Sequence, residues 1–360
     1  MNCGLSSINS FDGEAAVTTL NQAFAMCYRN LAVGHFYNEP FIAACTPWIN
    51  RIAEVFFAWP GVLSCRPAPE FTEEVRNRLF SDLQWCRAHG ICLDTLFNCN
   101  CYGEQAISEE LADFVAKVID EMGERGLAPD IVTTTSPFIA TVIRRRYPHI
   151  RIRASVNLRA HGTLGMEAVL DLFDEYYISR EYQRSFPYVK HCAQWASEHG
   201  KKLGMQVNSG CLRDCPFQIF HDNLHGHNRP RLAEQARKMD FSFFRCRTHY
   251  GRDKGFEDIL KATWIRPEDV PLWEPYISLF KLATRRISQP TRILNAYASY
   301  HHDGNLLDLL DPVHSDLFAP RILDNQRFPA DWATSGIGNE CALNCTHCGR
   351  CTTLLEQILH

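Results

Sequence analysis

The sequence has no long apolar run and no strong net charge, and each absence excludes a class of protein. None of its 360 residues belong to an apolar run as long as the roughly 18 residues of a membrane span. The first residues, "MNCGLSSINSFDGEAA", lack the basic start and apolar core of a secretion signal. A formal net charge of -4 gives no overall field that would hold a polyanion. We therefore expect a cytoplasmic protein without a membrane or nucleic-acid partner.

One local basic stretch, "RRRYPHIRIR" at 144–153, is the exception to this weak charge. It reads as the end of a helix that continues into a strand. Cationic residues are common in the last turn of a helix, where they face solvent and the negative end of the helix dipole. We interpret the stretch as a solvated helix end.

The sequence also lacks the local motifs of well-known hydrolases. It has no Gly-x-Ser-x-Gly elbow, no His-Glu-x-x-His helix and no Cys-His pattern with local support. These absences argue against a hydrolase. With 46% hydrophobic residues the chain can bury a sizeable core, and no linker divides it.

Short β-rich runs alternate with longer stretches of helical period. Such an alternation, repeated eight times, predicts a single α/β domain with the (β/α)8 fold of a TIM-like barrel. A ninth strand-like piece, 241–246, is assigned to an insertion after the seventh strand. The eight expected strands are 31–37, 52–59, 90–98, 130–136, 150–158, 175–180, 202–208 and 277–285.

Polar residues gather at the carboxyl ends of these expected strands, where barrel enzymes build their sites. Arg180, Lys281 and Arg285 are cations, and burying cations is costly unless an anion receives them. They predict a pocket for a small anionic substrate. Asn98, Asn157 and Asn208 are expected to contact that substrate, although Ser136 and Asn157 have capping of the next helix as an equal alternative.

Sixteen cysteines are too many for a chain in a reducing compartment unless some bind metal or take part in catalysis. Cys211, Cys215 and Cys246 lie in the expected insertion. The tail carries four more within a few residues. Thiolates are soft ligands that suit zinc or iron–sulfur clusters. The expected metal ligands are therefore Cys211, Cys215, Cys246, Cys341, Cys345, Cys348 and Cys351.

The spacing in the tail, "ECALNCTHCGRC", favours an iron–sulfur cluster, with zinc as the alternative. Zinc sites usually join two cysteine pairs separated by a dozen or more residues, whereas gaps of two and three residues are typical of cluster-binding loops. We expect a 4Fe–4S cluster, and two if the insertion binds one as well. We also expect the tail to pack across the carboxyl end of the barrel.

Three histidines, His221, His225 and His227, follow the cysteines of the insertion. His221 is a candidate general acid, and the alternative is that these rings orient loop carbonyls or face solvent.

The order of these motifs resembles peptidase family U32, the collagenase-like proteins. The resemblance covers about residues 30–290 and depends on "TLFN", "ASVNL", "YISREY", the cysteine-bearing insertion and "FKLATR". It implies a barrel with an oxygen-labile 4Fe–4S cluster, and several such proteins are oxygen-independent hydroxylases. Arg180 and Glu181 match the family's Ser-Arg-Glu motif, and Lys281 and Arg285 match its last strand. The resemblance also implies four cluster cysteines where this insertion has three, so the fourth position is open or is taken by Cys99, Cys101 or the tail.

Three functions are compatible with these patterns. The main prediction is an iron–sulfur-dependent, oxygen-independent redox enzyme, a hydroxylase or atom-transfer enzyme, with catalytic residues Arg180, Glu181, His221, Lys281 and Arg285. The alternatives are a cluster-carrying electron-transfer subunit and a U32-type hydrolase or peptidase. A redox partner protein is expected for the first, and the sequence does not indicate an oligomeric state.

The expected organisation has three parts. An N-terminal extension covers 1–30, the barrel covers 31–290 with the cysteine insertion at 209–262, and a C-terminal segment covers 291–360.

Overall fold

The fold is known from a computed structural model, which describes residues 29–64, 70–224, 227, 229–242, 244–252, 255–285, 287–336, 341 and 347–360. Nearly all of the expected N-terminal extension, 1–30, therefore lies outside the described residues. Among the described residues, no helix has the length and apolar character needed to cross a membrane.

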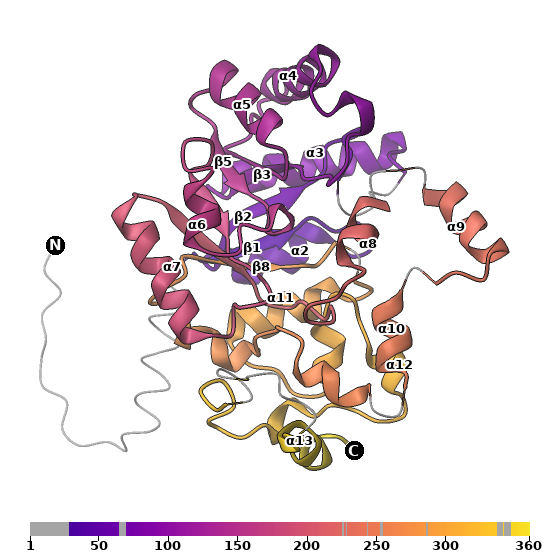
Figure 1. The fold of residues 1–360 in the computed structure, drawn as a ribbon. Coiled ribbons are helices and arrows are strands. Elements are labelled where there is room, and N and C mark those ends of the chain that lie inside the picture. Colours follow the sequence, from indigo (N-terminus) through magenta and orange to yellow (C-terminus); the bar gives the residue numbers. More distant parts are fainter. Residues whose placement is uncertain are drawn as a thin grey trace, which may run out of the picture.

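The chain forms a closed barrel of eight parallel strands with helices between them, as predicted (Figure 1). Closure is made by the first and last strands, where Ala32 pairs with Lys281. Each expected strand is present, although each is shorter than its apolar run because the residues at its carboxyl end turn into the mouth. The strands are β1 (Leu31–Gly34), β2 (Ile52–Phe57), β3 (Cys92–Phe97), β4 (Ile131–Thr134), β5 (Arg151–Ala154), β6 (Glu175–Tyr177), β7 (Lys202–Gln206) and β8 (Leu279–Leu282).

Helices outside the barrel begin at polar caps that the sequence provides. The Thr72 hydroxyl accepts a hydrogen bond from the Val75 amide at the start of α3, and Ser108 does the same for Leu111 in α4. The helices described are α2 (Phe41–Cys45), α3 (Glu73–Ala88), α4 (Glu109–Glu124), α5 (Pro137–Arg146), α6 (Thr163–Glu167), α7 (Phe186–Glu198), α8 (Gln218–Leu224), α9 (Arg229–Lys238), α10 (Arg245–Tyr250), α11 (Pro290–Ser299), α12 (Ser315–Phe318) and α13 (Arg350–Ile358).

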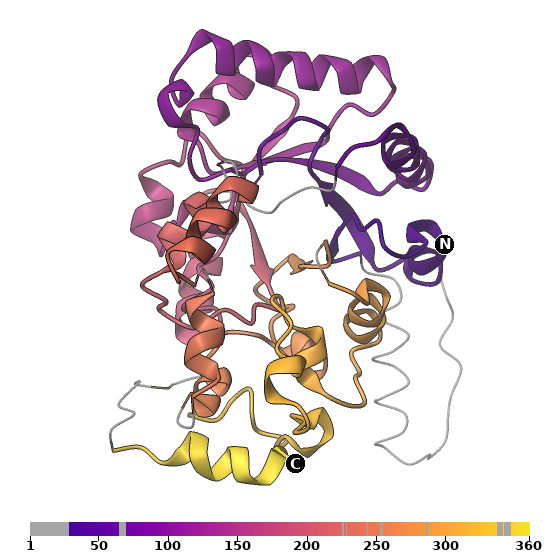
Figure 2. The same cartoon turned by 90° about the vertical axis from the view of Figure 1, so that its right-hand side faces the viewer.

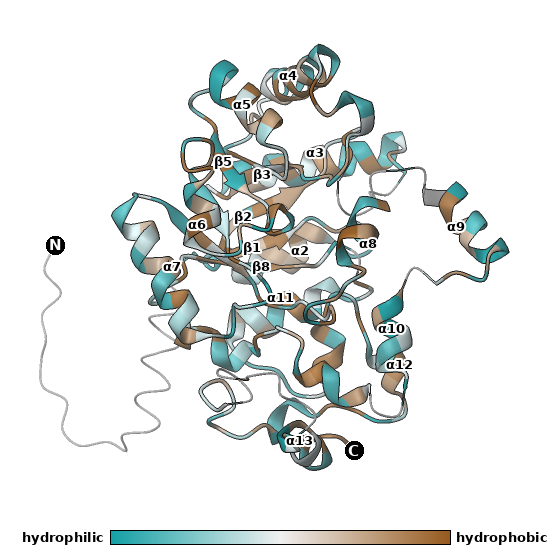
Figure 3. Ribbon diagram, viewed as in Figure 1, coloured by the Kyte–Doolittle hydropathy of each residue, from teal (hydrophilic) through white to brown (hydrophobic). Residues whose placement is uncertain are grey.

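Two apolar regions hold the fold together. A large core fills the space between strands and helices, and a small separate cluster lies inside the barrel. Figure 3 shows hydrophobic colouring on some of the central strands, such as β2, and both hydrophobic and hydrophilic segments on the outer helices. The inner cluster consists of Ala32, Phe56, Leu96, Tyr177 and Leu279.

The insertion after β7 carries α8, α9 and α10, and α9 projects from the body of the protein (Figure 1), so it lies towards the viewer in Figure 2. The strand-like piece expected at 241–246 is not a strand in the part that the structure describes. Instead, α10 begins at Arg245. The aromatic residues of this piece predicted a strand, but the eight described strands form a closed barrel in which each already pairs on both sides.

A buried ion-pair network occupies the lower interior of the barrel. Arg153 on β5 is 2% exposed, and its guanidinium donates to Glu54 Oε2 at 2.7 Å and to Glu175 Oε2 from Nε at 2.8 Å. Its Nη1 lies 3.3 Å from Asp94 Oδ2, which also accepts from the Thr133 hydroxyl at 2.7 Å. Several strands therefore supply the network, and it lies inside the barrel wall.

This network corrects our interpretation of the basic stretch 144–153 as a solvated helix end. That interpretation holds for Arg145 and Arg146, which are exposed at the end of α5. It is wrong for Arg153, because alternation along β5 turns that side chain into the barrel.

Candidate active site at the barrel mouth

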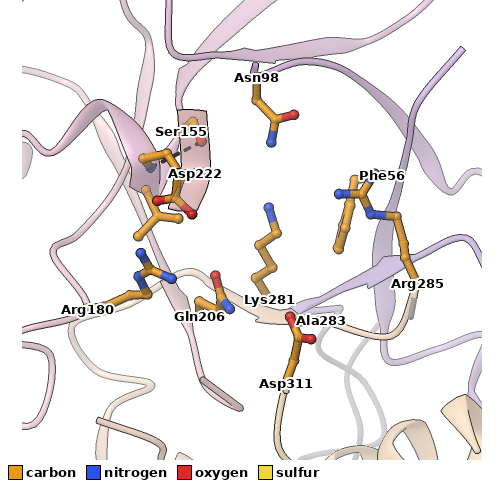
Figure 4. A pocket seen from close by; sticks show the side chains of 12 residues that line it. Phe56, Asn98, Ser155, Arg180, Gln206, Asp222, Lys281, Ala283, Arg285 and Asp311 are labelled. Carbon is orange, nitrogen blue, oxygen red and sulfur yellow. Dashed lines mark hydrogen bonds between the residues drawn. The ribbon is translucent and has the colours of Figure 1, made fainter. Parts of the chain in front are cut away.

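A pocket lies at the carboxyl ends of the strands, where (β/α)8 enzymes place their sites. About 560 Å³ at this position is not filled by atoms, a figure that includes open solvent. Figure 4 shows its side chains converging from several strands and from the following loops. The lining residues are Phe56, Asn98, Ser155, Val156, Asn157, Arg180, Gln206, Asp222, Lys281, Ala283, Arg285 and Asp311.

All three cations expected in the site line this pocket. Arg180 follows β6 and is 8% exposed, Lys281 lies on β8 and is 6% exposed, and Arg285 follows β8. Lys281 Nζ lies 4.3 Å from the centre of the Phe56 ring and 4.7 Å from that of Tyr177. These aromatic faces support the buried ammonium by cation–π attraction and leave it directed into the pocket (Figure 4).

The pocket also contains two carboxylates that sequence reasoning missed, Asp222 and Asp311. Asp222 lies on α8 and is 7% exposed, and its Oδ2 has no hydrogen-bond partner among the described residues. Gln218, one turn earlier, is buried as well, so the two share the inward face of α8. That spacing of four residues, in a helix next to the predicted mouth, was the available signal.

Of the three asparagines expected to contact substrate, Asn98 and Asn157 line the pocket and Asn208 does not. Asn208 is fully buried, and its amide holds loops together. Its Nδ2 donates to the carbonyls of Ala283 and Leu309 at 3.2 and 3.0 Å, and its Oδ1 accepts from the Ala283 amide at 2.8 Å. Asn208 therefore joins the end of β7 to the loops that follow β8 by hydrogen bonds.

Glu181 and His221 were predicted to be catalytic, yet neither is among the lining residues. Glu181 Oε2 accepts a hydrogen bond from the Asp214 amide at 3.0 Å, which fixes the loop after β7. His221 lies edge-on to Phe244, with the ring centres 5.7 Å apart. Of the other two histidines, His227 is exposed and His225 lies outside the described residues.

The three thiols of the insertion lie near one another. Burial raises the pKa of Cys246 to about 12, and the neighbouring Cys211 and Cys215 act in the same direction. Even so, no group of three or more His, Cys, Asp or Glu side chains within the described ranges is arranged to hold a metal ion. Cys99 is buried and donates to the Cys101 carbonyl at 3.0 Å. Metal binding by these thiols stays a prediction.

The structure describes three of the four tail cysteines, and Cys345 lies outside the described residues. Cys348 is exposed, whereas Cys351 is buried on α13. Both Cys341 and Cys351 are close enough to affect the pKa of Arg184. The described part of the tail contributes no residue to the mouth pocket, and Leu359 instead pairs with Leu323 in a short antiparallel bridge. The expectation that the tail covers the mouth is therefore not met by the residues described.

Comparison with known proteins gives one relative that matches along most of both chains. It is an uncharacterized protease of Methanocaldococcus jannaschii, 25% identical over 317 residues that cover 85% of this chain and 88% of the relative. No established protein-family profile matches the chain.

Solved structures with similar folds include the U32 peptidase Mk0906, with 15% identity and a TM-score of 0.46 over 56% of this chain and 77% of the other. A glycoside hydrolase family 5 mannosidase of Rhizomucor miehei has 8% identity and a TM-score of 0.38 over 81% and 95% of the two chains. Scores this low carry no argument about function.

The match along 85% of the chain to a protein named as a protease overturns our main prediction. The prediction of an iron–sulfur-dependent redox enzyme was wrong, and the hydrolase alternative agrees better with the relative. The short motifs misled us because they carry a resemblance without determining the reaction. The expectation of an enzyme is supported by the name of this relative, and the chain is similar to a protein named as a protease, in agreement with the resemblance to the collagenase-like U32 peptidases that the motifs indicate.

Proposed function

We propose that the protein is a hydrolase that cleaves an amide bond in a small, carboxylate-bearing peptide at the barrel mouth. The observation that carries this proposal is the Asp222 carboxylate, whose Oδ2 is buried in a cationic pocket without a hydrogen-bond partner among the described residues. The name of the M. jannaschii relative supports the reaction class.

The substrate would be held through its carboxylate. Guanidinium groups bind carboxylates with two parallel hydrogen bonds, and Arg180 and Arg285 both line the pocket. In Figure 4 they lie on opposite sides of Lys281, so a ligand bound to either one has its next atoms near the lysine. The amides of Asn98 and Asn157 add neutral donors and acceptors at the rim.

Hydrolysis needs a base for water and a positive group for the oxyanion. Asp222 Oδ2 would accept a proton from the attacking water as its oxygen bonds to the amide carbon. The Lys281 ammonium would stabilise the negative charge that develops on the carbonyl oxygen. When the C–N bond breaks, Asp222 returns the proton to the leaving nitrogen. This arrangement needs no serine elbow, which explains how a hydrolase lacks the motifs that we searched for.

Mass spectrometry of peptide libraries incubated with the purified chain tests this proposal. The wild-type chain should cleave short peptides that carry a free carboxylate and should spare the same peptides after amidation. Asp222→Asn should lower kcat at least 100-fold with little change in KM, because general-base catalysis contributes on the order of 100-fold or more.

Lys117→Ala, on the exposed side of α4, is the control and should retain full activity. Cleavage that persists unchanged in both Asp222→Asn and Lys281→Met would show that hydrolysis takes place elsewhere, and the proposal would be wrong. A chain that cleaves no peptide in the library would also overturn it.

A further inference from the structure

Asp94 lies beneath the mouth pocket and differs from the other carboxylates of the barrel interior. It is fully buried on β3, opposite Phe56 in the strand register, and Phe56 lines the pocket. Its Oδ2 accepts from Thr133 and Arg153, but its Oδ1 has no hydrogen-bond partner among the described residues. A buried carboxylate oxygen without a partner is costly, so it calls for an explanation.

The same carboxylate interacts electrostatically with Lys281, whose ammonium enters the pocket from β8. Burial, opposed in part by Arg153 and Lys281, raises the pKa of Asp94 to about 7. The charge under the pocket therefore changes near neutral pH, whereas a carboxylate with an ordinary pKa would stay ionised.

We propose that Asp94 is a positioning residue that sets the anion affinity of the mouth pocket through Lys281. When Asp94 is protonated, it no longer competes with a ligand for the charge of Lys281. When Asp94 is ionised, it attracts the ammonium from below and repels an anion above. This inference rests on the anion-binding part of the proposed function and adds a proton switch to it.

The charged and polar groups around Asp94 come from neighbouring strands of the barrel. From β5, Arg153 has a pKa raised well above its usual value, because Glu54 and its other acidic neighbours outweigh the effect of burial. From β6, burial acts to raise the pKa of Glu175, but Arg153 and Arg151 outweigh it and lower that pKa.

Tyr177, also on β6, has a pKa raised well above its usual value by burial. Glu54 comes from β2 and is held by Arg153, and Thr133 on β4 and Gln206 on β7 are neutral. Lys281 on β8 completes the set. Within this set, burial raises the pKa of Asp94 to about 7.

Sulfate is a suitable probe because it stays fully ionised across the range and requires no catalysis. Isothermal titration calorimetry of the full chain should show sulfate binding that weakens about tenfold from pH 6 to pH 8, the size expected for one buried charge several ångströms away. Asp94→Asn should bind sulfate at both pH values as the wild type does at pH 6, because the amide cannot ionise.

Thr133→Val provides a second variant if Asp94→Asn does not fold. It removes the hydroxyl that stabilises the ionised form, so the midpoint of the sulfate profile should move to higher pH. Asp82→Asn is the matched control, since Asp82 is a buried carboxylate that bonds His35, and its profile should be unchanged.

An Asp94→Asn chain that keeps the wild-type pH dependence overturns the inference, as does a wild-type chain that binds no sulfate. Failure of the hydrolase proposal is a separate result. A chain that cleaves no peptide but shows the sulfate profile described would retain the switch and lose only the reaction.

Discussion

The lower interior of the barrel and its mouth contain similar charged residues in opposite arrangements. In the lower interior, one guanidinium, that of Arg153, bonds the carboxylates of Glu54 and Glu175 and approaches Asp94. At the mouth, three cations and two carboxylates line a pocket that is partly open to solvent. Most of the interior carboxylate oxygens bond to Arg153, with Asp94 Oδ1 as an exception, whereas the mouth charges also line a pocket.

This difference indicates that the position of a charged residue along its strand decides whether it stabilises the fold or is available for binding. A charged side chain in the middle of a barrel strand is surrounded by other strands. Its burial is tolerated only where oppositely charged side chains of the barrel pair with it. A charge at the carboxyl end has neighbours on one side and a pocket on the other. The same residue types therefore serve stability in one layer and binding in the next.

The strongest test of the comparison is Arg153→Met. The methionine keeps much of the length of the side chain but leaves three carboxylates without their shared cation. We expect the free energy of unfolding at pH 7 to fall by about 3 to 5 kcal/mol, the usual cost of breaking a buried ion pair from one side. Urea unfolding followed by circular dichroism measures it. A loss below about 1 kcal/mol would mean that the network is not the structural element we describe.

The second prediction separates Asp94 from the rest of the network by pH. Its pKa is raised to about 7 by burial, so its contribution to stability is complete below its unfolded value of 3.8 and is lost as pH rises through 7. The amide in the Asp94→Asn variant does not titrate, so the variant has no such loss. Relative to the wild type, it should therefore gain about 2 to 3 kcal/mol between pH 5 and pH 8. Parallel urea curves at the two pH values provide the comparison, and a constant difference would contradict the raised pKa.

The third prediction moves to the mouth. Arg180→Ala should weaken sulfate binding about tenfold or more, because a charge-assisted hydrogen bond is worth about 1.5 to 3 kcal/mol. Its effect on the free energy of unfolding should stay below about 1 kcal/mol if the guanidinium serves a ligand, as for other substitutions that break no structural contact. The same two measurements on Arg153→Met should give the reverse pattern. Equal destabilisation by both variants would remove the distinction between the layers.

The sequence was sufficient to predict the fold. Eight apolar runs separated by helical stretches predicted each strand of the barrel, because a closed parallel sheet buries both faces of every strand. It also placed Arg180, Lys281 and Arg285 at one mouth, since each comes at or near the end of a strand.

The buried network was not predicted, although the sequence carried a signal for it. Glu54, Asp94, Arg153 and Glu175 are each charged residues inside or beside an apolar strand, as in "IAEVFF" and "CLDTLF". Such a charge requires a partner of opposite sign in another strand. In any single strand, the charged residue is typical of an exposed position. The register of the closed sheet is what brings the four side chains together.

The side chains that depend on loop conformation could not be predicted in this way. Glu181 and Asn208 lie near pocket residues in sequence, but their hydrogen bonds to backbone groups turn them into loop supports. Asp222 enters the pocket only because α8 folds back over the mouth. Long insertions have no fixed path relative to the barrel, so residue spacing does not determine which side chain they deliver.

The smallest effect is expected for an ion pair outside both layers. Arg146 and Asp113 bond on the surface between α5 and α4 at 3.1 Å, with side chains 46% and 71% exposed. Solvent screens such a pair, so Asp113→Ala should change the free energy of unfolding by less than about 1 kcal/mol and should leave sulfate binding unchanged. Urea unfolding at low and high salt measures the pair, and the small difference should shrink further at high salt. A loss of stability as large as that of Arg153→Met would show that burial does not decide how much an ion pair contributes to the free energy of unfolding. The contrast between barrel interior and surface would then be wrong.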